Sequence, residues 1–156
     1  MGALVDALYQ KQILSLAHNA RASTLDFTPS QTASCNNPVC GDKVSVSIAI
    51  QADRVSNISV DVKGCALCEA GAGLLLETAR DEMIDNIKNL DAELKAFLSA
   101  KDIDEKQTGN EIAEKIQIFT PVKAIRNRHK CVILAFDAFN EAVDLFRADR
   151  DLIESP

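Results

Sequence analysis

The feature that most constrains this chain is a change of hydrophobic period at Gly64. Before Gly64, β-branched apolar residues alternate with small or polar residues, at Val44–Ile50 and again at Ile58–Val62. Such alternation predicts strands over 44–50 and 55–63, each buried on one face, and the short polar stretch between them predicts an antiparallel hairpin. After Gly64 the apolar residues recur at helical spacing, so we expect helices and no further strands.

The same patterns extend the expected fold to the whole chain. The stretch 21–41 is rich in Ser, Thr, Asn and Pro, and we predict that it is irregular. The polar stretch 101–110 is expected to be a solvated connection. The expected helices cover 4–20, about 68–79, 87–98, 111–118 with Asn110 as its N-cap, and 131–146. The sequence therefore predicts an α+β fold, in which a small antiparallel sheet packs against several α-helices as one domain over 1–156.

Length and charge argue against several classes of protein. The 156 residues suit one domain, and the net charge of −6 argues against binding nucleic acid by neutralising phosphates. The chain contains no apolar run long enough to span a bilayer, and its first residues lack the basic and apolar pattern of a secretory signal. We therefore expect a cytoplasmic protein without nucleic-acid or membrane partners.

The chain has five cysteines, and four of them lie where a predicted element begins or ends. Cys40 precedes the first strand, Cys65 and Cys68 follow the second strand, and Cys131 opens the last helix. The hairpin should bring Cys40 close to Cys65, although they are far apart in sequence. An odd number of cysteines without an export signal argues against a disulfide framework, which leaves core packing, metal binding, or redox and sulfur chemistry.

The residues beside these cysteines favour metal chemistry, with simpler alternatives for each. Thiolates with one carboxylate, from Asp42, or one imidazole, from His129, form a donor set that suits zinc or iron. Asp42 could equally be a turn residue, and His129 a solvated neighbour of the surrounding cations. We expect Cys68 to be a spare sulfur, either an alternative ligand or a sulfur acceptor, and Cys35 to be a small buried side chain or a bystander.

Three motifs together resemble the iron–sulfur cluster assembly scaffolds of the IscU, SufU and NifU N-terminal type. They are Pro38-Val39-Cys40-Gly41-Asp42 before an alternating strand, Gly64-Cys65-Ala66 before a helix, and Pro121-Val122-Lys123 followed by Cys131-Val132-Ile133-Leu134-Ala135-Phe136. The motifs occur in the family's order, and the resemblance covers about residues 4–148. It implies a NifU/IscU-like fold and a scaffold or carrier rather than an enzyme, with no catalytic residues of its own.

The resemblance also implies ligands, cofactors and partners. Cys40, Asp42, Cys65 and Cys131 would hold iron and a transient [2Fe–2S] cluster, with zinc at the same residues in the cluster-free form. The implied partners are a cysteine desulfurase, recipient apo-proteins, and an Hsp70-type chaperone that recognises the Pro121 motif.

Two departures from the IscU pattern keep other functions open. Lys130, not a histidine, directly precedes Cys131, as in SufU-like members, and Cys68 adds a thiol. The alternatives are a zinc-dependent sulfur acceptor that activates a cysteine desulfurase, and a structural zinc domain with an interaction role.

Overall fold

The computed structural model describes residues 2–39, 41–99 and 111–154, with side chains over 7–39, 41–99 and 114–150. Short 3₁₀ turns, η2 at Thr120–Val122 and η3 at Arg126–Arg128, link the last two helices. The remaining elements are α1 (Gly2–Arg21), β1 (Gln31–Asn37), β2 (Asp42–Gln51), β3 (Arg54–Lys63), α2 (Ala66–Ala79), α3 (Ile84–Ser99), α4 (Glu111–Gln117) and α5 (His129–Glu154).

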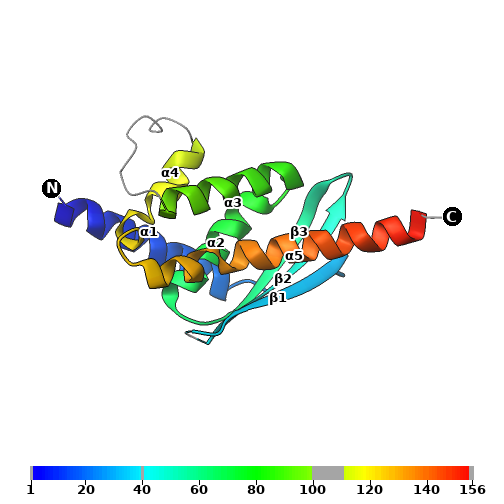
Figure 1. Ribbon diagram of the computed structural model, residues 1–156, viewed down its shortest axis with the longest axis horizontal. Helices are drawn as coiled ribbons and strands as arrows, with labels where there is room; N and C mark the ends of the chain where they lie inside the picture. Colours follow the sequence, from blue (N-terminus) through cyan, green and yellow to red (C-terminus); the bar gives the residue numbers. More distant parts are fainter. Residues whose placement is uncertain (1, 40, 100–110, 155–156) are drawn as a thin grey trace.

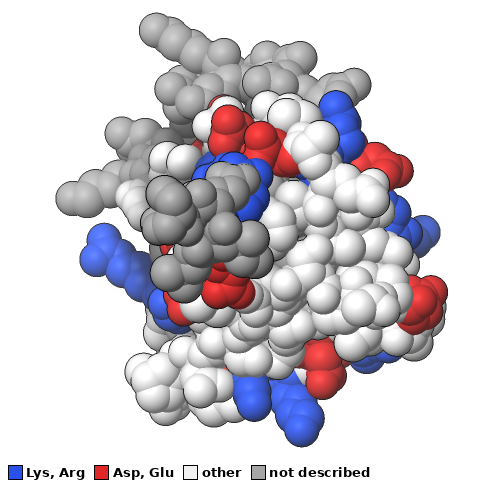
Figure 2. Space-filling model, turned by 90° about the vertical axis from the view of Figure 1, so that its right-hand side faces the viewer, with Lys and Arg blue, Asp and Glu red and all other residues white. Residues whose placement is uncertain are grey.

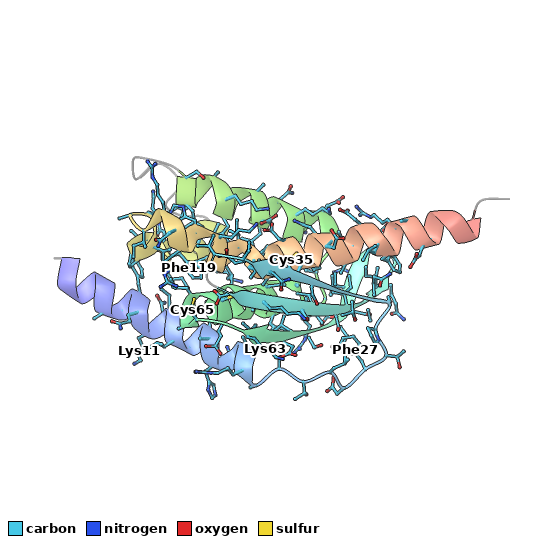
Figure 3. The ribbon with its side chains drawn as sticks, turned by 60° about the horizontal axis from the view of Figure 1, so that its bottom comes forward. Lys11, Phe27, Cys35, Lys63, Cys65 and Phe119 are labelled. Carbon is cyan, nitrogen blue, oxygen red and sulfur yellow. The ribbon has the colours of Figure 1, made fainter. Side chains whose placement is uncertain are left out.

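The strands form one antiparallel sheet in the order β1-β2-β3, and helices cover one of its faces. The long helix α5 runs across this face, with α3 along its other side (Figure 1). When the bottom of this view is turned forward, the strands are seen below α5 and α3 (Figure 3). The predicted α+β fold is confirmed. Among the described residues, no helix combines the length and apolarity that crossing a membrane requires.

The predicted hairpin is present, and its register puts the alternating apolar residues on one face. Val44, Val46 and Ile48 pair with Val62, Val60 and Ile58, and all but the half-buried Val62 are buried. The two strands are joined by Ala52 and Asp53, which have φ angles of 53° and 61°. Positive φ at both central residues is the two-residue turn whose twist matches that of the flanking strands.

The prediction that 21–41 is irregular is wrong for its second half, where β1 pairs with β2 along its whole length. The strand QTASCNN has no large apolar residue, so it carries no hydrophobic alternation. The side chains on its inward face are small because α5 packs over them. On the outward face, the hydroxyl of Thr32 lies 2.9 Å from that of Ser47 on β2, and Ser34 and Ser45 are 2.6 Å apart. Such hydroxyl pairs stabilise neighbouring strands without apolar burial.

The helices begin close to the predicted positions, but α5 continues to Glu154, well beyond the predicted end at 146. The N-cap of α2 is Cys65, and α5 begins at His129, two residues before Cys131. The predicted connection at 101–110, with its N-cap Asn110, lies outside the described residues. The largest fully buried side chains include Phe119, Phe136 and Phe139, so α5 supplies much of the core.

Two glycines let α2 pack against its neighbouring helices at backbone distance. A β-carbon on Gly71 would overlap the carbonyl oxygen of Val132 on α5, and one on Gly73 would overlap that of Leu16 on α1. Since no side chain fits in either contact, the three helices are held closer together than ordinary helix packing allows. Val132 directly follows Cys131, so the Gly71 contact also fixes where Cys131 lies relative to α2.

A partly buried network of charged and polar side chains links α3 to α5 on the other side of the core. Lys95 of α3 donates to Asp91 on its own helix and to Asp137 on α5, each at 3.0 Å, and Asn140 donates to Asp91 at 2.8 Å. Burial disfavours the charged form of Lys95, but its two carboxylate partners outweigh this effect and raise the pKa above its ordinary value. Elsewhere charges of both signs are interspersed, as on the face in Figure 2.

We predict that Gly71→Ala destabilises the protein, although alanine is the better helix former by about 1 kcal/mol. The added methyl group must push α5 away from α2, and overpacking of this kind costs about 1–3 kcal/mol. Thermal or denaturant unfolding of the variant should therefore show a lower free energy of unfolding. A more stable variant would mean that α5 can shift without loss, and the packing argument would be wrong.

Candidate metal centre

Three separate elements bring a carboxylate and two thiols together at one end of the sheet. Asp42 opens β2, Cys65 follows β3 as the N-cap of α2, and Cys131 lies in the first turn of α5. One ligand atom from each residue lies within 4.8 Å of the other two. In Figure 3, Cys65 marks this end of the sheet. Soft sulfur donors with one carboxylate form a set that binds zinc or iron.

The turn between β1 and β2 positions the carboxylate. Gly41 has a φ of 77°, a left-handed conformation that glycine adopts without steric cost. Its N–H donates to the carbonyl of Asn37 at 2.8 Å, and Asn37 pairs with Asp42 across the two strands. The side-chain oxygen of Asn37 also accepts from the N–H of Val39 at 3.2 Å. The turn is thus tied at both ends, and Asp42 follows directly from it.

The junction of β3 and α2 holds Cys65 beside that carboxylate. The Sγ of Cys65 donates to Oδ2 of Asp42 at 3.6 Å. The residue before it, Gly64, leaves room for this contact, because a β-carbon there would lie 2.7 Å from both Cγ and Oδ1 of Asp42. Asp42 is 5% exposed, whereas Cys65 is only half-buried, so the group opens to solvent on the side of Cys65.

Cys131 is the most deeply buried member of the group. It is fully buried, and the side-chain amide of Asn37 lies 4.0 Å from its Sγ, within reach of a weak hydrogen bond. Asn37 therefore links the β1–β2 turn to the start of α5. Two thiolates and a carboxylate at such short distances repel one another unless protons or a cation balance them, and this favours cation binding.

The remaining predicted site residues lie elsewhere or outside the described part of the chain. Cys40 lies outside the described residues. Cys68 is fully buried in the first turn of α2 and is not a member of the three-residue group. His129 is also outside the group: its Nε2 donates to the carbonyls of Val122 and Lys123, both at 3.0 Å. A carbonyl can only accept, so this nitrogen carries a hydrogen and ties η2 to the start of α5.

Cys35 differs from the grouped thiols in its surroundings. It lies on β1 beside α5 (Figure 3), and it is half-buried against the core. Burial raises the pKa of the Cys35 thiol, the charges of Asp137 and Glu141 raise it further, and Lys130 opposes them. A thiol held protonated is a poor metal ligand, which agrees with its interpretation as a small buried side chain.

The sequence analysis did not identify two residues that support the site, Asn37 and Gly64. Asn37 stands before a proline, and the Asn-Pro pair signals a turn. Nothing in the sequence indicates its contact with Cys131, which comes from an element 94 positions away. Gly64 was noted as the point where the period changes and as part of the Gly64-Cys65-Ala66 motif, but not as a support for Asp42. Its close approach to Asp42 depends on the pairing of β2 with β3.

Comparison with known proteins identifies the family to which this arrangement belongs. The model of the NifU-like N-terminal domain matches residues 8–151. The chain belongs to this family. The resemblance seen in the three cysteine motifs is therefore confirmed.

Several relatives of this NifU-like domain carry functional names. The iron–sulfur cluster assembly scaffold protein IscU of Thermotoga maritima is 25% identical over 87% of this chain and 92% of its own length. The zinc-dependent sulfurtransferase SufU of Bacillus subtilis is 23% identical over 89% of this chain and 91% of its own length. The crystal structure of the N-terminal NifU-like protein of Brucella abortus has the same fold, with a TM-score of 0.79, 22% identity, and coverage of 92% of this chain and 97% of that one.

We predict that Gly64→Ala weakens metal binding by this NifU-like domain. The new β-carbon must displace the Asp42 carboxylate, which then loses its place beside Cys65. We expect the zinc affinity, measured by competition with a chromophoric chelator, to fall about tenfold, as for loss of a supporting contact to a ligand. The exposed neighbour Lys63 provides the control, since Lys63→Ala should leave the affinity unchanged. Equal affinity in both variants would show that the carboxylate can reorient without leaving the metal.

Proposed function

We propose that this protein is a scaffold that assembles a [2Fe–2S] cluster from iron and desulfurase-supplied sulfur and passes it to apo-proteins. The proposal rests on one observation. Asp42, Cys65 and Cys131 meet at a partly exposed end of the sheet, and their ligand atoms lie within 4.8 Å of one another. The name of the Thermotoga maritima relative supports the same role. The cluster is the cargo of such a protein, which acts as a carrier rather than as a catalyst.

The donor set suits that cargo. Cysteine thiolates are the usual ligands of iron–sulfur clusters. Cys40 completes the set in this proposal, because it stands two residues before Asp42 in the Cys-Gly-Asp motif of the family resemblance. A single carboxylate among thiolates is a harder, weaker ligand for such a cluster, so it gives the site one bond that opens readily.

A zinc-dependent sulfur acceptor is the second candidate, and the spacing of the ligands is compatible with it as well. Sulfur ligands on one tetrahedral zinc stand about 3.8 Å apart, given a zinc–sulfur distance of about 2.3 Å. Three ligand atoms within 4.8 Å of one another can therefore share one ion. The Bacillus subtilis relative is named for this activity, and Lys130 stands before Cys131 as in SufU-like members. Zinc would then occupy the site in the cluster-free form.

A purely structural zinc site is the weakest of the three candidates. Proteins that need zinc to fold have little apolar core of their own. Here Phe119, Phe136 and Phe139 are fully buried in a core that extends well beyond the site. We therefore expect the protein to stay folded when a chelator removes its metal.

The proposed partners follow from the same function. A cysteine desulfurase would deliver sulfur to the partly exposed thiol, and recipient apo-proteins would take the finished cluster. A chaperone of the Hsp70 type remains a prediction from the motif Pro121-Val122-Lys123. In the folded protein, Val122 of this motif is buried, and Lys123 lies 4.5 Å above the ring of Phe97.

Anaerobic reconstitution with iron and sulfide tests the proposal directly. The wild-type protein should develop the absorption of a [2Fe–2S] cluster, and Cys65→Ser should lower the bound iron because a member of the ligand group is lost. Cys68→Ser should keep the iron content of the wild type, since Cys68 is outside that group.

Two results would contradict this assignment. Tight binding of one zinc per chain without any cluster on reconstitution would favour the sulfur acceptor. Equal loss of metal in Cys65→Ser and Cys68→Ser would mean that both thiols serve as ligands and that the ligand group is wrongly assigned.

We further predict that Asp42→Ala slows release of the cluster to an apo-ferredoxin severalfold. Removing the weak ligand leaves the cluster held by soft thiolates, and the readily opened bond is lost. Circular dichroism of the apo-ferredoxin as it acquires its cluster gives the transfer rate. Unchanged transfer with a lower melting temperature would instead show that Asp42 only supports the turn before β2.

A further inference from the structure

The first turn of α2 holds a pair of thiols in unequal environments. Cys65 is the N-cap, with an extended backbone at φ −76° and ψ 170°, and Cys68 is the third helical residue. Cys65 is half-buried and belongs to the ligand group, whereas Cys68 is fully buried and does not. The function proposed above uses Cys65 and leaves Cys68 without a role.

At a helix start, the N-cap residue and the third helical residue are neighbours in the first turn. An N-cap side chain can reach back over the first turn toward the third helical residue, as it does in a capping box. Here Cys65 makes no such cap bond, and its Sγ donates to Asp42 instead, so a rotation of its side chain is needed to bring it toward Cys68. The turn is closed here, because the N–H of Glu69 donates to the carbonyl of Cys65 at 3.0 Å. A disulfide needs β-carbons about 3.5–4.5 Å apart. Since Cys65 lies outside the helical backbone conformation, rotation at this residue is not restricted by the helix and can turn its sulfur toward Cys68.

The two thiols differ in solvent exposure, and this determines which compounds each can react with. A sulfur donor from solution can reach Cys65 but not Cys68, which has no exposed surface. Cys68 can react only with a group already attached nearby. When one cysteine is exposed and a second is buried beside it, the exposed thiol reacts first with a compound from solution. The buried thiol can then displace the attached group by forming a disulfide with its neighbour.

We propose that Cys68 converts sulfur carried on Cys65 into sulfide. This inference rests on the proposed role in sulfur handling. The Sγ of Cys68 attacks the Sγ of a Cys65 persulfide, so that a Cys65–Cys68 disulfide forms and the bond to the outer sulfur breaks. The outer sulfur leaves with the electron pair and, with its own hydrogen and the proton of Cys68, becomes hydrogen sulfide. Two cysteine sulfurs are oxidised and one sulfane sulfur is reduced, so atoms and electrons balance.

This step has two consequences for the site. It delivers sulfur in the reduced form that a cluster contains, beside the metal ligands Asp42 and Cys131. It also withdraws Cys65 from the ligand group until the disulfide is reduced. A low-molecular-weight thiol can do this by attacking the partly exposed sulfur of Cys65, because its own oxidation to a disulfide supplies the two electrons.

The experiment uses the full chain without metal and glutathione persulfide as the sulfur donor, under anaerobic conditions. Released sulfide is measured over time, and the quenched protein is digested with trypsin. Cleavage after Lys63 and Arg80 yields one peptide that contains both Cys65 and Cys68, and cleavage after Lys130 places Cys131 on another. Mass spectrometry therefore distinguishes a Cys65–Cys68 disulfide from any other pairing.

The wild-type protein should release sulfide, and its 64–80 peptide should lose the mass of two hydrogens. Cys68→Ala should keep one added sulfur on this peptide and release sulfide at least about tenfold more slowly, because the resolving thiol is absent. Cys35→Ala is the matched control, since it removes a thiol outside the group and should behave like the wild type. Because Cys68 is buried, Cys68→Ser is a second variant, and circular dichroism verifies the fold of both.

Sulfide release from the Cys68 variants at the wild-type rate would overturn the proposal, as would a disulfide between Cys65 and another peptide. These outcomes are distinct from failure of the proposed function, which iron or zinc binding reports separately. A protein that binds metal normally but yields no 64–80 disulfide would retain its carrier role and refute the role of Cys68.

Discussion

The close contact between α2 and α5 is the constraint on which the rest of this structure depends. Gly71 lies directly against the backbone of Val132, where no side chain could fit. The contact lies within two helical turns of Cys65 and one residue from Cys131. Helices at ordinary packing distance would separate the two thiols by the width of a layer of side chains. A packing feature of the core therefore sets the spacing of the candidate metal ligands.

The carboxylate is held by different forces. Asp42 owes its position to strand pairing, because it faces Asn37 across β1 and β2 and follows the left-handed turn at Gly41. Asn37 then connects this part of the sheet to α5 through Cys131. The group is thus assembled from a turn, a helix cap and a first helical turn. All three are ends of elements, and of the three side chains the half-buried Cys65 is the one that a partner can reach.

Much of this arrangement could be predicted from sequence, because it follows from local patterns. The alternation around Val46 and Val60 determines both strands and the face that each buries, and the helical spacing after Gly64 determines α2. The cysteine motifs identified the family correctly. The strand β1 could not be predicted in this way. Its inward residues, such as Ala33 and Cys35, are small to fit beneath α5, so they carry no hydrophobic signal of their own.

The sequence by itself determined the kinds of chemical group, the order of the elements and the ends at which the cysteines stand. Each of these is a property of neighbouring residues along the chain. Only the tertiary structure decided which groups meet. It brought one ligand atom each of Asp42, Cys65 and Cys131 within 4.8 Å of one another. It also directed His129 toward the carbonyls of Val122 and Lys123. It also buried Cys68 while leaving Cys65 accessible. Local patterns cannot contain this information, because these distances depend on how closely separate elements pack, and that packing involves residues far apart in sequence.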